Sequence, residues 1–147
     1  MASDAGQPLP FRLTVRVYYE DTDAGGVVYH ARYLHFMERA RTEWLRALGF
    51  EQDRLRAEQG VLFAVRRMEL AFLFPARFND LLVVESSLTH AGRASLDFAQ
   101  RVQRAADAKR CCEATVNIAC LDALALRPAR IPEAIMTALP PETRHGR

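Results

Sequence analysis

One long helical pattern lies between a single strand pattern and four consecutive strand patterns, and this order most limits the folds open to the chain. Residues 11–19 alternate apolar and polar side chains, which is the period of a strand with one buried face. Residues 30–48 carry apolar side chains at helical spacing, and Gly49 follows where a helix can end. Four β-rich runs separated by short turn signals come next: 61–74, 81–89, 94–104 and 111–125.

This order predicts an α+β fold with an antiparallel sheet. Strands joined by short reversals pair antiparallel, because parallel neighbours need a long crossover connection. The helix has one apolar stripe, and five strands wrapped around one long central helix would bury it. Such a sheet leaves an exposed edge, which a second copy of the chain can cover by edge pairing. We therefore expect a homo-oligomer, either a homodimer or a homotetramer built as a dimer of dimers.

Chain length and composition predict one domain. The 147 residues, of which 50% are hydrophobic, suffice for one core. A short helix is expected over 133–139, after Pro132. We expect a flexible N-terminal segment over 1–10, a folded domain over 11–140 and a flexible tail over 141–147.

Charge and hydropathy argue against several classes of partner. The 20 basic and 18 acidic residues are well mixed, which disfavours nucleic-acid binding. No apolar run approaches the roughly 20 residues of a membrane span, and the first ten residues lack the pattern of a signal peptide. We expect a cytoplasmic protein that is not embedded in a membrane.

The cysteines and histidines do not form a metal-binding pattern. Cys111, Cys112 and Cys120 fall within one predicted strand and lack the C-x-x-C spacing of a zinc site. We expect these thiols to be small core side chains, with neither a metal nor another cofactor. The sequence also lacks the Gly-x-Ser-x-Gly motif of serine hydrolases.

The segment between the first strand and the long helix carries the candidate chemistry. Residues 19–30 include Asp21, Asp23, Gly25 and Gly26. The first turn of a helix leaves backbone N–H groups without partners in the helix, and these groups favour negative charge. This segment would therefore place carboxylates close to free hydrogen-bond donors. An Asp in such a loop can also simply stabilise a turn, and we expect this structural role for Asp21.

The same segment resembles the signature of a known family. Together with later motifs it is similar to hotdog-fold acyl-CoA thioesterases of the 4-hydroxybenzoyl-CoA thioesterase type, in the bacterial branch associated with the Tol-Pal cell-envelope system. The family fold is the same strand, helix and four-strand sheet. Five motifs in matching order carry the resemblance: 19–41, 63–68, 75–80, 92–95 and 127–132.

The resemblance implies hydrolysis of an acyl-CoA thioester to a free carboxylic acid and CoA. Asp23 matches the family's catalytic carboxylate, acting either as the nucleophile or as the general base. His30 is implied as an auxiliary residue that orients Asp23 or water, or assists the departing thiol. Backbone N–H groups near Gly26, Tyr29 and His30 are implied as the oxyanion stabilisers.

The remaining implied residues bind substrate. Tyr29 and Tyr33 are expected to line or close the pocket, with core packing as the alternative. Coenzyme A brings phosphates, and arginine binds phosphate in a bidentate fork. The matching cations could equally be ordinary surface charges, or could act from a neighbouring subunit: Arg93, Arg127 and Arg130.

Several alternatives stay open. Glu38 lies on the helix that carries the catalytic carboxylate in some hotdog enzymes, but with Asp23 in place we expect it to form a buried or interfacial ion pair with a helix arginine. An acyl carrier protein could replace CoA as the carrier. The chain could also be a non-catalytic acyl- or CoA-binding protein, an interaction protein serving envelope or lipid-synthesis machinery, or a dehydratase of hydroxyacyl thioesters.

Overall fold

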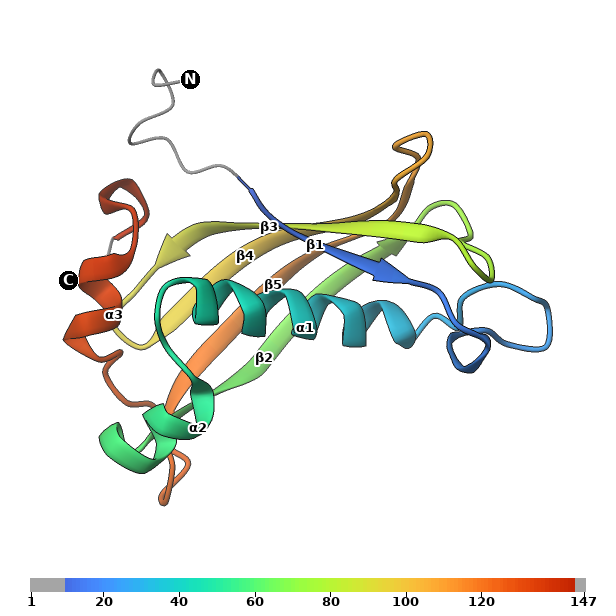
Figure 1. The fold of residues 1–147 in the computed structure, drawn as a ribbon. Helices are drawn as coiled ribbons and strands as arrows, with labels where there is room; N and C mark the ends of the chain where they lie inside the picture. Colours follow the sequence, from blue (N-terminus) through green and yellow to red (C-terminus); the bar gives the residue numbers. More distant parts are fainter. Residues whose placement is uncertain (1–9, 145–147) are drawn as a thin grey trace.

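The computed structural model describes residues 10–144 of the chain. Most of the predicted N-terminal segment 1–10 and the last residues of the predicted tail lie outside this range. The elements, drawn in Figure 1, are β1 (Phe11–Arg16), η2 (Tyr19–Asp21), α1 (Arg32–Ala47), α2 (Gln52–Arg54), η3 (Leu55–Gln59), β2 (Val61–Phe72), β3 (Leu81–Ala91), β4 (Ser95–Arg104), β5 (Arg110–Asp122), α3 (Glu133–Ala138) and η4 (Pro141–Thr143).

The five strands form one antiparallel sheet in the order β1-β3-β4-β5-β2. Strands β1 and β2 are therefore its two edges. Helix α1 runs along one face of the sheet (Figure 1). The expected α+β fold, a five-stranded antiparallel sheet around one long helix, is confirmed.

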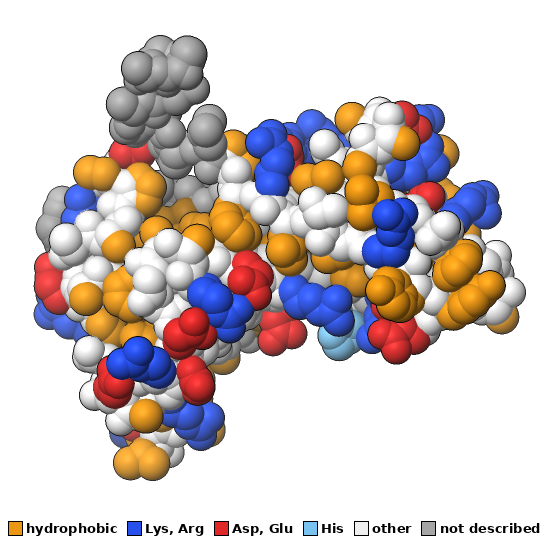
Figure 2. Space-filling view, in the orientation of Figure 1, with side chains coloured by type: hydrophobic (Ala, Val, Ile, Leu, Met, Phe, Trp, Pro, Cys, Tyr) orange, Lys and Arg blue, Asp and Glu red, His pale blue; other side chains and the backbone are white. Residues whose placement is uncertain are grey.

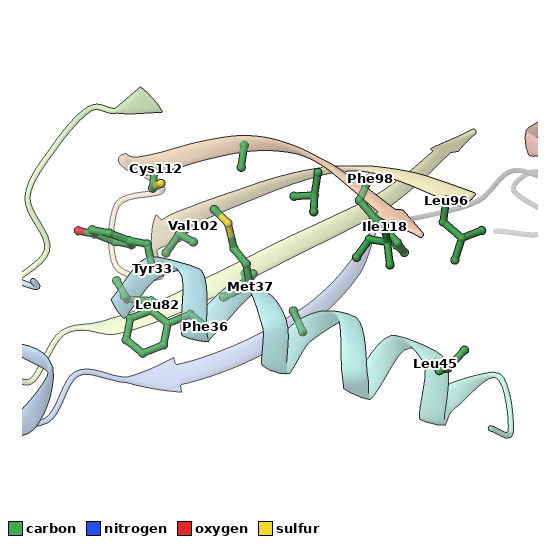
Figure 3. Packing of buried hydrophobic residues seen from close by; sticks show 14 of the residues in the cluster. Tyr33, Phe36, Met37, Leu45, Leu82, Leu96, Phe98, Val102, Cys112 and Ile118 are labelled. Carbon is green, nitrogen blue, oxygen red and sulfur yellow. The ribbon is translucent and has the colours of Figure 1, made fainter. Parts of the chain in front are cut away.

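The core lies between α1 and the sheet. The buried face of α1 is the one that its apolar spacing predicts, and Figure 3 shows Tyr33, Phe36 and Met37 among side chains from the strands. Burying each large apolar side chain stabilises the fold by roughly 1.5–3 kcal/mol. The strand residues labelled in the same view are Leu82, Leu96, Phe98, Val102, Cys112 and Ile118.

A buried amide ties α1 to the middle of the sheet. Gln100 of β4 is 1% exposed. Its Nε2 donates to Ser86 Oγ at 2.8 Å and to the Met37 carbonyl oxygen at 3.1 Å. Its Oε1 accepts from Arg41 Nη1 at 2.8 Å. Each polar atom of the amide thus has a partner, as a buried polar group requires.

The first strand is shorter than its alternation predicts. It ends at Arg16, and the chain then turns into the 3-10 helix η2. The Asp21 carboxylate causes this turn, because Oδ2 accepts the N–H of Tyr18 at 2.8 Å. A local bond from a side chain to the backbone has outcompeted the sheet ladder.

The predicted flexible tail begins with residues that are packed against the sheet. Residues 141–143 form η4, Thr143 is 4% exposed, and Arg144 pairs with Ala91 of β3. Thr143 Oγ1 also donates to the Pro140 carbonyl oxygen at 2.7 Å. This bond and the burial of one threonine hold residues 141–144 against the sheet, and the flexibility expected for 141–147 stays a prediction.

Residues 10–144 contain neither a membrane-spanning helix nor a cluster of metal-binding side chains. In this range no helix is long and apolar enough to cross a bilayer, and no group of three or more His, Cys, Asp or Glu side chains could hold a metal ion. The three cysteines are free and buried, as the sequence predicts.

Candidate active site

The loop between β1 and α1 is fixed by backbone hydrogen bonds to a neighbouring turn and within itself. Val28 N–H donates to the Ala76 carbonyl oxygen at 2.8 Å. Val27, which precedes Val28, forms an antiparallel bridge with Arg77, which follows Ala76. Asp23 N–H donates to the Val27 carbonyl oxygen at 2.9 Å. The position of Asp23 is thus set by contacts to residues more than fifty positions away.

Asp23 presents its carboxylate at the surface. Its Oδ1 accepts the N–H of Gly25 at 2.8 Å, and the side chain makes no ion pair within residues 10–144. Gly26 has φ +81°, a left-handed conformation that favours glycine. A Cβ at Gly25 would lie 3.3 Å from Asp23 Oδ1. The two glycines therefore serve different purposes: Gly26 allows the turn, and Gly25 leaves room for the carboxylate.

Asp21 is the structural carboxylate of the loop, as predicted. It is 5% exposed, and besides the Tyr18 N–H it faces Arg32, whose Nε lies 3.0 Å from Oδ1. That contact is an ion pair whose angle does not make a hydrogen bond. Asp21 therefore anchors η2 to the start of α1.

Two of the three predicted oxyanion donors are occupied by the loop itself. Gly26 N–H donates to the Asp23 carbonyl oxygen at 2.9 Å, and Tyr29 N–H donates to the Asp21 carbonyl oxygen at 2.8 Å. The N–H of His30 has no acceptor within residues 10–144. Of the three predicted donors, only the backbone N–H of His30 is therefore free to bind an oxyanion, because the N–H groups of Gly26 and Tyr29 already donate to carbonyl oxygens of the loop.

The imidazole of His30 is exposed and lies among aromatic rings. Its centroid is 4.5 Å from that of Tyr29 and 6.1 Å from that of Phe72. It borders a cavity of about 210 Å³ that Tyr33 and Cys111 also line. Within the described range no hydrogen bond joins His30 to Asp23.

The two tyrosines predicted for the pocket occupy different environments. Tyr29 is 46% exposed, whereas Tyr33 is 4% exposed. The hydroxyl of Tyr33 accepts the N–H of Ala76 at 3.3 Å, and burial raises the pKa of Tyr33 to about 12. Tyr33 is therefore a core residue that also forms one wall of the small cavity.

A larger cavity of about 500 Å³ lies between α1 and β2. It begins at Ala31, directly after His30, and continues along the helix to Leu45. Sequence patterns did not locate it, because its walls come from a helix and from strands far apart in the chain. Its apolar lining includes Leu34, Trp44, Phe63, Met68, Leu96 and Phe98. Asp23 lines neither this cavity nor the smaller one.

The polar residues of the large cavity include Glu38 and Arg41. Burial lowers the pKa of Arg41, and the nearby charge of Glu38 opposes that shift. Arg41 hydrogen bonds to Gln100, and Glu38 forms no ion pair among residues 10–144. The expected ion pair of Glu38 with a helix arginine is therefore not formed among residues 10–144, and an interfacial pair stays a prediction.

The three predicted CoA-binding arginines lie together, but far from Asp23. Arg93 is in the turn after β3, and Arg127 and Arg130 follow β5. The N–H of Ile131 donates to the Arg93 carbonyl oxygen at 2.8 Å, which joins the two segments. Asp23 lies at the other end of α1 (Figure 1), a helix of 16 residues and so about 24 Å long. These exposed arginines form no ion pair within residues 10–144.

Comparison with known proteins shows which family this chain belongs to. The family model described as "Thioesterase-like superfamily" matches residues 17–139. The acyl-CoA thioesterase YbgC of Haemophilus influenzae is 46% identical over 128 residues, which cover 87% of this chain and 93% of that protein. The acyl-CoA thioester hydrolase YbgC of Escherichia coli O6:H1 is 48% identical over 126 residues, covering 86% of this chain and 92% of that protein.

A solved structure shows the same fold. The crystal structure of a probable thioesterase from Bartonella henselae is 36% identical, covers 84% of this chain and 99% of that one, and superposes with a TM-score of 0.79. The chain therefore belongs to the thioesterase-like superfamily and has the hotdog fold.

Proposed function

We propose that this protein hydrolyses acyl-CoA thioesters to a free carboxylic acid and CoA. The observation that carries the proposal is the loop over 19–30, which holds both the exposed carboxylate of Asp23 and the free amide of His30 in a chain of this family. The two YbgC relatives, which match over most of both chains, support the same reaction and the same substrate class.

Each step of the reaction has a candidate group in the loop. The Asp23 carboxylate either attacks the thioester carbonyl carbon, forming an anhydride that water opens, or removes a proton from the attacking water. The N–H of His30 stabilises the developing oxyanion, a contribution typically worth about 100-fold or more in rate. The imidazole of His30, on the residue that carries this amide, assists the departing thiol.

The acyl group fits the large cavity. Its lining begins at Ala31, the residue after His30, and its apolar walls favour a hydrocarbon or aromatic acyl chain. Tyr33 lines the smaller cavity beside His30, so Tyr33 and the exposed Tyr29 would contact the substrate near the loop. The remainder of the substrate, CoA or an acyl carrier protein, stays outside.

We propose that two copies complete the site by pairing their β2 edges. Strand β2 is an unpaired edge, and Val65 and Phe72 on it are 46% and 52% exposed. Antiparallel pairing about a two-fold axis places the Val61 end of one strand beside the Phe72 end of the other. This arrangement brings one subunit's arginine end towards the Asp23 end of its partner. Arg93, Arg127 and Arg130 would then bind CoA phosphates across the subunit boundary, in a homodimer or in a tetramer of two such dimers.

A cytoplasmic location agrees with the state of the thiols. Cys111, Cys112 and Cys120 are free and buried. Free cysteines are the usual state in a reducing compartment. The proposed reaction requires no metal or cofactor.

Release of free thiol from a panel of acyl-CoAs tests the proposed function. The panel should contain short, medium, long and aromatic acyl groups, each compared with its spontaneous hydrolysis. We expect hydrolysis of at least one member. Binding of acyl-CoA without thiol release would instead identify a binding protein, and an enoyl product from a hydroxyacyl-CoA would identify a dehydratase.

A further inference from the structure

The edge strand β2 carries a cation and an anion two residues apart, and neither has an ionic partner in its own chain. Arg67 and Glu69 are exposed and form no ion pair within residues 10–144. Met68, which lies between them, lines the cavity at α1. Successive side chains of a strand point to opposite faces, so Arg67 and Glu69 share the face that is turned away from α1.

A bulge at Arg66 sets the order of faces along this strand. In the ladder with β5, Val65 pairs with Ile118 and Arg67 pairs with Asn117, so Arg66 is skipped. The guanidinium of Arg66 is bound within its own chain, since its Nε donates to Asn117 Oδ1 at 2.7 Å. The side chains on the α1 face are therefore Phe63, Val65, Met68, Leu70 and Phe72, and those on the outer face are Ala64, Arg67, Glu69 and Ala71.

The charges on β2 are complementary to those of a second β2 strand in one register only. When two copies pair antiparallel about a two-fold axis, facing residues lie on the same face of the sheet. With Met68 on the axis, Arg67 faces Glu69 of the partner subunit, and the same pair forms again on the other side of the axis. Moving the axis to Arg67 or to Glu69 instead makes two like charges face each other. Opposite charges across a strand pair are favourable and like charges are unfavourable, so the charges select the register centred on Met68.

The same register matches the apolar side chains on the α1 face. With the bulge residue skipped, Leu70 faces Val65 of the partner subunit. Phe72 then faces Phe63 of the partner subunit. Val65 and Phe72 are 46% and 52% exposed in the single chain, so this pairing removes apolar surface from water.

A second copy suits this edge better than a partner of one strong charge. Positive and negative side chains are interspersed on the face shown in Figure 2, and the net charge of the chain is only +2. The β2 edge supplies both members of each charge pair, which is the property of a two-fold interface.

We propose that two copies of this chain pair their β2 strands with Met68 on the two-fold axis, in a register fixed by reciprocal ion pairs between Arg67 and Glu69. The proposal rests on the shared site of the proposed function, because it specifies which part of the partner reaches that site. The ring centroid of Phe72 lies 6.1 Å from that of His30. The register therefore brings Phe63 of the partner subunit beside the aromatic rings at the end of the loop over 19–30.

Charge reversal tests the ion pairs. Arg67→Glu leaves two acids on each β2 strand and Glu69→Arg leaves two bases, so the dimer Kd of each variant should rise about tenfold or more at low salt. Mixed in equal amounts, the two variants should form heterodimers, because every facing pair then has opposite charges. The double variant with both reversals should dimerise like the wild type. Arg56→Glu is the matched control, since Arg56 is equally exposed but lies in η3. Analytical ultracentrifugation measures all five samples.

Cross-linking measures the register directly. Met68→Cys places two introduced thiols opposite each other on the axis, where facing Cα atoms are about 4.5–5.5 Å apart, within the span of a disulfide. With oxidised glutathione as the oxidant, Met68→Cys should form a covalent dimer. Leu70→Cys should not, because the two introduced thiols would lie on opposite sides of the axis. The native cysteines are buried, which makes them poor competitors.

Several results would overturn the proposal. Single reversals that dimerise like the wild type, or a mixture that forms no heterodimer, would remove the ion pairs. A Met68→Cys protein that dimerises without cross-linking would remove the register, and a monomeric wild type would remove both. These measurements need no turnover, so a wild-type dimer with the expected cross-link that releases no thiol would reject the proposed function and leave the register standing.

Discussion

Gly25 and Gly26, in the loop that holds Asp23, are required for different physical reasons, and substitution can separate these two reasons. Gly26→Ala places a Cβ on a backbone with φ +81°, which costs roughly 1–2 kcal/mol. Gly25→Ala meets no such strain but crowds Asp23 Oδ1 at 3.3 Å. We expect urea denaturation to show a loss of stability mainly for Gly26→Ala. Thiol release should fall in Gly25→Ala with stability kept to within about 0.5 kcal/mol; equal stability losses would contradict this division.

Buried acids of the core make the fold sensitive to alkali. Burial raises the pKa of Tyr33 to about 12 and that of Cys112 to about 12. In the unfolded chain the phenol ionises near pH 10, whereas in the folded chain it keeps its proton until about pH 12. Over that window the unfolded state binds fewer protons, so the free energy of unfolding falls as pH rises.

Tyr33→Phe tests the tyrosine's share of this effect. Between about pH 10 and 12 its free energy of unfolding should fall less steeply than that of the wild type. At neutral pH it should be about 1 kcal/mol less stable, because the N–H of Ala76 loses its acceptor. Parallel slopes for the two proteins in urea denaturation would refute the assignment.

At the scale of elements, the sequence predicts the order and type of each helix and strand well. Periodicity is strong in α1 and in the four later strands, and Pro132 marks the start of α3 as expected. The strand pattern is too long where a short polar side chain redirects the backbone, at Asp21 after β1, and Thr143 makes a similar bond in the tail. Both bonds join residues three positions apart, and hydrophobic periodicity does not register such local bonds from a side chain to the backbone.

Gln100 links two elements, so its removal should be costly. Gln100→Ala breaks the bonds to Met37, Ser86 and Arg41 in a fully buried position. We expect a loss of about 2–3 kcal/mol in the free energy of unfolding. The matched control is Gln103→Ala on the same strand, which is half-buried and should change stability by less than about 0.5 kcal/mol. Similar losses for both variants would show that the network does not stabilise the α1 packing.

At the scale of the whole molecule, the sequence places the proposed catalytic residues in one segment but does not place the arginines near them. Asp23 and His30 share one loop, so their common position before α1 follows from the chain itself. Arg93, Arg127 and Arg130 are placed by the direction of β3 and β5 across the sheet, and this direction carries them away from Asp23. The occupied amides of Gly26 and Tyr29 were equally unpredictable, since they depend on how the turn closes.

Pairing through β2 would resolve that separation and can be measured. Val65→Glu should place charge at the proposed edge and convert the oligomer to monomers, as followed by light scattering. The same variant should have a raised KM for acyl-CoA, because the partner's arginines are lost. Leu124→Glu is the control, since Leu124 is 95% exposed and lies in the turn after β5, not on the β2 strand itself. A wild-type protein that is monomeric at working concentrations would contradict the shared site.

The central claim, that the Asp23 carboxylate performs the chemistry, is tested most directly by the turnover of Asp23→Asn. The amide oxygen can still accept the N–H of Gly25, so the variant should fold with an unchanged melting temperature. Glu20→Gln in the same loop serves as the control for loss of one surface charge. We expect thiol release from the best acyl-CoA of the panel to fall by about 100-fold or more in Asp23→Asn and to stay near wild type in Glu20→Gln. Turnover retained by a folded Asp23→Asn protein would contradict the account.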